Sequence, residues 1–209
     1  PVAVPGLPFA SSMLCAFDRP TRALLRQDRI AVKVLLISSL FWFMGGTMHQ
    51  LVNEFGVYQW KLGDAKTSLL LASIGVGIAV GCVSAAKLSR HRINFALVTR
   101  GAWGMMFCLV VLWLIAWMAG SPSVWSEANW HWWGAPTVLP GVWMWGAGAA
   151  LSLLGFSAGI FVVPLQVFLQ VCSTGELKGR MMGTMNLINF CGLVASAVAF
   201  LALRSLCLL

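Results

Sequence analysis

The sequence predicts an all-α protein, a polytopic bundle of transmembrane helices. The first observation behind this prediction is composition: 59% of the 209 residues are hydrophobic, only 10% are charged, and the mean hydropathy is +0.85. Soluble domains carry roughly a quarter charged residues, because their surface faces water. A chain with so few charges cannot cover such a surface, and we therefore expect the lipid bilayer to surround it.

The second observation is that five apolar stretches are long enough to cross a bilayer, which takes about 20 residues of helix. They run approximately over 32–52, 67–88, 95–119, 142–171 and 182–203. A helix closes its backbone hydrogen bonds within its own segment, as lipid requires. We therefore predict a transmembrane domain over residues 32–209. Residues 1–31 begin with a proline-rich stretch, which favours a linker.

The basic residues predict the orientation. If the five helices alternate in direction, eleven of the 14 Lys and Arg residues lie on one side: Arg19, Arg22, Arg26, Arg29, Lys33, Lys87, Arg90, Arg92, Arg100, Lys178 and Arg180. Only Lys61, Lys66 and Arg204 lie on the other. Cytoplasmic loops carry this excess, so we expect the linker to be cytoplasmic. The same placement accounts for the net charge of +8 without a nucleic-acid partner.

The segment between the third and fourth stretches is rich in tryptophan. It contains Trp125, Trp130, Trp132 and Trp133, and Trp117, Trp143 and Trp145 flank it. Indole rings prefer the headgroup layer, where the ring is half wet and its N–H finds a partner. We expect an interfacial belt; a platform that binds sugars or aromatic ligands is the alternative.

No residue pattern predicts catalysis or metal binding. The three histidines, His49, His91 and His131, are too far apart in sequence to suggest a metal pair. The six cysteines include no CxxC pair, and most of them lie in apolar stretches, where Cys behaves as a small hydrophobe. We therefore expect no enzyme activity, no metal and no cofactor.

One cluster of polar residues lies at the outer end of the first predicted helix. His49 and Asn53 are four residues apart, and so are Gln50 and Glu54, so each pair shares a helix face. Glu54 lies roughly 30 Å along the helix from Lys33, which is an interfacial depth. A solvated helix end and the lining of a substrate pathway both fit this pattern.

A second polar cluster joins the last two predicted helices. Gln166 and Gln170 share a face near the inner end of the fourth helix, and Asn186 and Asn189 share one near the inner start of the fifth. A short loop joins these antiparallel helices, so the four amides lie at similar depth. Amides both donate and accept hydrogen bonds, which suits a lipid headgroup or a contact between helices. Both interpretations stay open.

Proline and glycine add two local predictions. Pro164 removes one backbone hydrogen bond from the fourth helix, which predicts a kink of the kind found where transporter helices bend. Gly77 and Gly81, like Gly155 and Gly159, are spaced for close contact between helices. Packing alone explains these glycines.

Two loop sequences resemble the carboxyl-terminal half of the major facilitator superfamily. Gly81-Cys-Val-Ser-Ala-Ala-Lys-Leu-Ser-Arg-His-Arg92 has small residues at a helix end and then a basic turn that includes Arg90, although the acidic residue usual in that motif is absent. Gly175-Glu-Leu-Lys-Gly-Arg-Met-Met-Gly183, with Gly179 and Arg180, resembles the matching turn before the penultimate helix.

Other segments resemble the bacterial lysophospholipid transporter branch of that superfamily. They are Phe161-Val-Val-Pro-Leu-Gln-Val-Phe-Leu-Gln170, Asn186-Leu-Ile-Asn-Phe190, Phe41-Trp-Phe-Met-Gly45 and Leu62-Gly-Asp-Ala-Lys-Thr-Ser-Leu-Leu70. The resemblance covers about residues 18–205. It implies that the five helices are the seventh to eleventh of twelve, and that the chain is a piece lacking the twelfth helix and the amino-terminal half.

The resemblance also implies a function: movement of a lysophospholipid across the bacterial inner membrane, next to a fused or associated acyltransferase. On this interpretation the inner gate includes Gln166, Gln170, Asn186 and Asn189, and the outer end is lined by His49, Asn53 and Glu54. Two alternatives stay open: an exporter of small solutes or drugs with the same fold, and a membrane anchor for the acyltransferase.

Overall fold

The computed structural model describes residues 28–60, 62–89, 95–119, 141–173 and 178–207. They form helices α2 (Arg29–Glu54), α3 (Asp64–Ser89), α4 (Phe95–Ala119), α5 (Gly141–Cys172) and α6 (Lys178–Cys207), with a short π-helix, η2 (Phe55–Gln59), after α2. No strand occurs in these ranges. Five helices of the described part are long and apolar enough to cross a membrane. The all-α fold and the multi-pass membrane character predicted from the sequence are thus confirmed.

The helices begin and end within four residues of the predicted spans. α4 has the predicted bounds, and α5 is one residue longer at each end. α2 begins at Arg29, inside the predicted linker, because the Asp28 carboxylate accepts hydrogen bonds from the N–H groups of Ile30 (2.8 Å) and Ala31 (3.3 Å) and caps the helix. The rest of that linker, residues 1–27, lies outside the described residues.

The π-helix η2 was not predicted. Its wider turn ends where the N–H of Trp60 donates to the carbonyl of Phe55 (2.8 Å). The chain then turns at Gly63, whose φ of 76° lies in the left-handed region that favours glycine. α3 starts directly after it, and the N–H and hydroxyl of Thr67 both donate to the carbonyl of Gly63.

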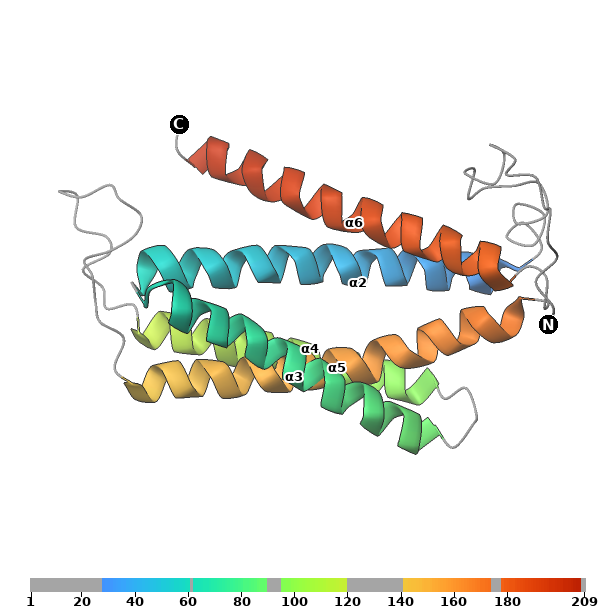
Figure 1. The fold of residues 1–209 in the computed structure, drawn as a ribbon, viewed down its shortest axis with the longest axis horizontal. Helices are drawn as coiled ribbons and strands as arrows, with labels where there is room; N and C mark the ends of the chain where they lie inside the picture. The colour runs from blue at the N-terminus through green and yellow to red at the C-terminus, as the bar shows by residue number, and fades with distance from the viewer. Residues whose placement is uncertain (1–27, 61, 90–94, 120–140, 174–177, 208–209) are drawn as a thin grey trace, which may run out of the picture.

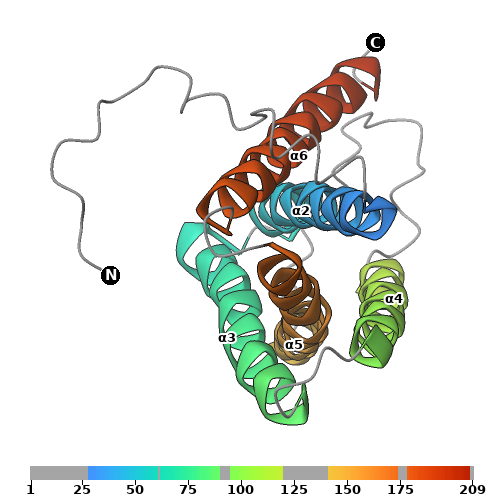
Figure 2. The same cartoon turned by 90° about the vertical axis from the view of Figure 1, so that its right-hand side faces the viewer.

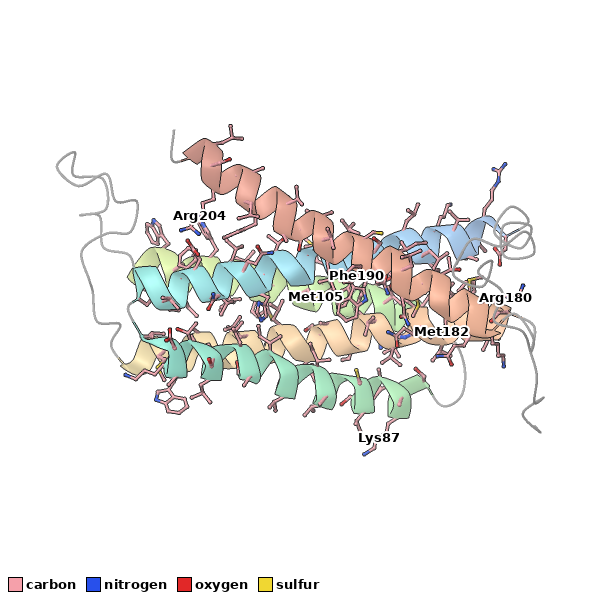
Figure 3. The ribbon with its side chains drawn as sticks, turned by 45° about the horizontal axis from the view of Figure 1, so that its top comes forward. Lys87, Met105, Arg180, Met182, Phe190 and Arg204 are labelled. Atoms are coloured by element: carbon pink, nitrogen blue, oxygen red, sulfur yellow. The ribbon has the colours of Figure 1, made fainter. Side chains whose placement is uncertain are left out.

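The helices run alternately up and down the bundle (Figure 1). α2 and α6 begin at the same end, where α3 and α5 finish; we call this the basic end, because Lys33, Lys87 and Arg180 lie near it. Figure 3 shows Lys87 and Arg180 at the basic end and Arg204 at the opposite end, beside the end of α2. Seen along the bundle, α5 lies between α3 and α4, and α2 separates this group from α6 (Figure 2).

The core has two clusters of buried residues. Near the basic end, residues of α2, α5 and α6 pack together: Ala31, Val34, Leu35, Phe161, Leu165, Leu169, Met181 and Met185. Toward the opposite end the cluster is Val52, Trp60, Leu70, Cys108, Ala147, Leu151 and Leu154. Large apolar side chains such as Trp103, Phe107 and Phe190 are also exposed on the surface. An apolar exterior around an apolar core fits a protein embedded in lipid.

Glycines bring α3 and α5 into direct backbone contact. A Cβ at Gly77 or Gly81 would overlap the α5 backbone at Ser152 or Phe156, and a Cβ at Gly155 would overlap the α3 backbone at Ile74. The close contact predicted from the glycine spacing is therefore confirmed. Because α3 and α5 run in the same direction, this is a parallel pair.

Candidate functional site

A row of polar contacts joins α2 to α6, and we call it the polar seam. The hydroxyl of Ser38 donates to Oδ1 of Asn189 (2.9 Å), and that of Ser39 donates to the carbonyl of Ile188 (3.0 Å). Farther from the basic end, Nε2 of Gln50 donates to Oγ of Ser196 (3.5 Å). At the opposite end, Nη2 of Arg204 lies 3.6 Å from Oε1 of Glu54.

The parallel packing of α2 and α6 explains this row. The hydrogen-bonded residues are 151, 149 and 146 positions apart, so the two helices advance together along the seam. Small residues let them approach. A Cβ at Gly46 would overlap the side chain of Ser196, and one at Gly192 would lie 2.5 Å from the carbonyl oxygen of Ser39. The seam therefore results from a glycine in each helix and from polar side chains in register.

The four predicted gate amides differ in their surroundings. Asn189 is buried and accepts the hydrogen bond from Ser38, so it serves the contact between α2 and α6. Gln166 is half-buried, whereas Gln170 and Asn186 are exposed. Within the part of the chain that the structure describes, the side-chain amides of these three residues have no hydrogen-bond partner.

The amides do lie in the same half of the bundle. At a rise of about 1.5 Å per residue, Gln166 is about 9 Å from the end of α5, and Asn186 is about 12 Å from the start of α6. The structure does not join the four by hydrogen bonds. Instead, α5 and α6 meet near the basic end through the apolar cluster that contains Leu169 and Met185.

The polar cluster at the end of α2 opposite the basic end separates into two faces. His49 and Asn53 are exposed. Gln50 and Glu54 face Ser196 and Arg204 of α6. Gln50 also donates to the carbonyl of Gly46, one turn earlier in α2 (3.2 Å). Glu54 is buried rather than solvated, and its Oε1 lies 3.6 Å from Nη2 of Arg204.

Two buried side-chain polar atoms in the described ranges lack a hydrogen-bond partner, and both lie near the end of α2. They are Oε1 of Glu54 and Nε1 of Trp60. The Trp60 ring packs edge-on against Phe55, with ring centroids 6.1 Å apart, inside the second apolar cluster. Oε1 of Glu54 lies 3.6 Å from Nη2 of Arg204.

Of the residues predicted for the loop motifs and for the helix kink, those that the structure describes lie in different helices. Gly81 is buried against α5, while Gly179 and Arg180 are exposed at the start of α6. Arg90 and Arg92 lie outside the described residues, as do most of the tryptophans of the predicted belt. Pro164 is buried within α5, which continues through it to Cys172 and bends in its last third (Figure 1).

Several residues of the site carried no clear signal in the sequence. Ser38, Ser39 and Ser196 are single hydroxyls in apolar helices, and only their partners give them a role. Arg204 had a usable signal: it is a lone cation near the end of the fifth helix, on the side of the membrane predicted for Glu54. Pairing these two charges from sequence was possible in principle, since an ionised group in lipid needs a partner.

Ser157 lies in a motif that the sequence analysis did not consider when it predicted no catalytic site. Gly155-Phe-Ser-Ala-Gly159 has the G-x-S-x-G spacing of a hydrolase nucleophile elbow. That elbow requires a sharp turn between a strand and a helix. Here Ser157 is buried in the middle of α5 and donates to the carbonyl of Leu153 (2.9 Å), while both glycines pack against α3. The spacing therefore reflects helix packing.

In the ranges that the structure describes, no three His, Cys, Asp or Glu side chains are placed to hold a metal ion. Comparison of the chain with known protein families, curated proteins and solved structures finds no match. The site is therefore interpreted from its own residues and geometry.

Proposed function

We propose that this chain is part of a secondary transporter that moves a lysophospholipid across the bacterial inner membrane by alternating access, with its amino-terminal segment in the cytoplasm. In this proposal it works with further helices that complete the transporter, and an acyltransferase that consumes the lysophospholipid is fused to it or associated with it. The sequence resemblance to the major facilitator superfamily suggests this class of transporter.

The observation that carries the proposal is a pair of accessible amides within membrane-spanning helices. Asn186 is exposed and Gln166 is half-buried, and among the described residues neither side chain has a hydrogen-bond partner. A polar group left unsatisfied in hydrocarbon costs several kcal/mol. Such groups therefore usually face a water-filled path, a ligand or a neighbouring helix. A zwitterionic headgroup offers both donors and acceptors to an amide.

The polar seam supports the same proposal. Asn189 is held by Ser38 at about the depth of Asn186, so the seam positions the face of α6 that carries Asn186. We assign Gln166, Gln170 and Asn186 to the headgroup and Asn189 to the contact between helices. The acyl chain stays in the apolar surroundings of the exposed helix faces.

Uptake of lysophosphatidylethanolamine by spheroplasts that express the complete protein tests the proposal. We expect the double variant Gln166→Ala/Asn186→Ala to lose most of the uptake at equal expression, because it removes two of the three amides that we assign to the headgroup. The matched control is Thr99→Ala, which removes an exposed polar group from α4 and should leave uptake unchanged. Normal uptake by the double variant would remove these amides from the mechanism.

The same protein distinguishes the two rival functions. A ligand-dependent rise in melting temperature with small drugs, and none with lysophospholipids, would favour an exporter. If neither class binds and the membrane part moves no lipid, it serves as an anchor.

A further inference from the structure

The ion pair between Glu54 and Arg204 is asymmetric. The Glu54 side chain is 12% exposed, whereas that of Arg204 is 40% exposed. Glu54 ends α2 and Arg204 lies in the last turn of α6, so the pair stands at the end of the bundle opposite the basic end. The carboxylate is thus enclosed, while the guanidinium reaches the surface.

The contact between the two groups is also loose. Nη2 of Arg204 is 3.6 Å from Oε1 of Glu54, which is longer than a hydrogen bond, and Oε1 has no hydrogen-bond partner in the described part of the chain. Within the same ranges, the side chain of Arg204 donates no hydrogen bond. Arginine has five N–H donors arranged as a planar fork. Most of its capacity to bind an oxyanion is therefore unused.

A phosphate group fits this arrangement better than the carboxylate does. Arg binds phosphate through two parallel charge-assisted hydrogen bonds, roughly twice as strong as neutral ones. The carboxylate of Glu54 compensates the charge of Arg204 when no ligand is bound, but at 3.6 Å it forms no such bonds. A cation near a helix end also extends toward the headgroup layer, where lipid phosphates lie.

We infer that Arg204 is the outer binding site for the phosphate of a lysophospholipid, and that Glu54 is the resident counter-ion which the phosphate displaces. This inference rests on the proposed function and adds to it the residue that receives the substrate. The seam connects this site to the amides, because α6 carries Arg204, Asn189 and Asn186. Binding at Arg204 weakens its attraction to Glu54 and so loosens the outer contact between α2 and α6.

The test is equilibrium binding to the full-length protein in nanodiscs of neutral lipid. Three probes distinguish the contribution of the phosphate from that of the acyl chain. They are lysophosphatidylethanolamine, the same headgroup without an acyl chain (glycerophosphoethanolamine), and monoacylglycerol, which has no phosphate. We expect the first to bind most tightly, the second more weakly and the third not at all. Equal binding of monoacylglycerol would overturn the inference, because it would exclude phosphate recognition.

Variants that replace a charged side chain with a neutral amide test whether Arg204 binds the phosphate. Arg204→Gln should weaken lysophosphatidylethanolamine binding about tenfold or more, whereas Glu54→Gln should strengthen it several-fold by removing the competitor. The double variant Glu54→Gln/Arg204→Gln leaves no unpaired charge, so its fold is preserved, and it should bind as weakly as Arg204→Gln. Lys66→Gln removes an exposed cation at the same end and should change binding less than about twofold.

The outcomes separate the inference from the proposed function. If the unmodified protein binds lysophosphatidylethanolamine and the double variant binds it equally well, Arg204 is not the phosphate site, although transport can still hold. If Glu54→Gln weakens binding as much as Arg204→Gln, the pair is only a structural contact and the inference fails. No binding by the unmodified protein would overturn both proposals.

Discussion

The two parallel helix pairs of this bundle are held together in different ways. Between α3 and α5, glycines bring backbone against backbone: Gly77 and Gly81 meet α5, and Gly155 meets α3. Between α2 and α6, side chains make the contacts, from Ser38 and Asn189 to Glu54 and Arg204. In lipid neither pair gains a hydrophobic driving force, since the surrounding tails are as apolar as the helices.

The difference indicates which pair can rearrange. Backbone contact through glycine depends on close fit, so we expect α3 and α5 to resist displacement along each other. A polar contact can exchange one partner for another of similar chemistry, such as water or a headgroup. We therefore assign the rigid part of the structure to α3, α4 and α5, and the adjustable part to α2 and α6.

The largest effect should come from the glycine pair. In Gly77→Val the side chain would overlap the α5 backbone at Ser152, and we expect a loss of about 2 to 3 kcal/mol in the free energy of unfolding. The matched control is Gly75→Val in the same helix, because a Cβ at Gly75 has no neighbour within 4 Å. Reversible unfolding in mixed micelles measures both. Equal losses would show that helix propensity, and not contact with α5, sets the stability.

A smaller effect is expected at the ion pair. Arg204→Gln leaves the buried Glu54 carboxylate without a counter-ion, which should cost about 1 to 2 kcal/mol, less than for a fully buried pair because Arg204 is partly exposed. Adding Glu54→Gln should restore part of that loss, since no charge then remains unpaired. The same unfolding measurement applies. A double variant less stable than Arg204→Gln would show that Glu54 stabilises the fold without Arg204.

The smallest effect is expected inside the seam. A double-mutant cycle with Ser38→Ala and Asn189→Ala should give a coupling energy of about 0.6 kcal/mol, the average for hydrogen bonds between membrane helices. A parallel cycle with Ser38→Ala and Asn186→Ala serves as the control and should give a coupling near zero, because Asn186 is exposed. Similar coupling in the two cycles would mean that α6 rotates freely against α2.

The sequence predicted the membrane spans because a run of apolar residues and its length are local properties. It also predicted the glycine contact, since two glycines four residues apart lie on one helix face. It did not predict which helices pair, namely the second with the fourth and the first with the fifth. Helices that are apolar on all sides have no stripe that marks the partner, so the facing residues follow from the fold.

In the candidate site, too, the sequence predicts local properties but not the packing of the helices. The depth of Gln166 and Asn186 could be predicted by counting residues from the helix ends. That Asn189 is bound to Ser38 while Asn186 is exposed depends on the direction in which α6 packs, which no local pattern encodes. The π-helix at Phe55–Gln59 could not be predicted for a similar reason, since one extra residue in a helical turn does not change the composition of the segment.

The pairing of α2 with α6, which lie far apart in the sequence, also sets an order of assembly. A ribosome releases α2 before α6, and the hydrogen-bonded residues of the seam are about 150 positions apart. The glycine contact between Gly77 and Ser152 joins segments about half as far apart, so α3 and α5 can associate while α6 is still being synthesised. During that interval Ser38, Gln50 and Glu54 enter the membrane before their partners on α6 exist. Early insertion of this helix therefore depends on the translocation machinery or on water to satisfy those groups until α6 arrives.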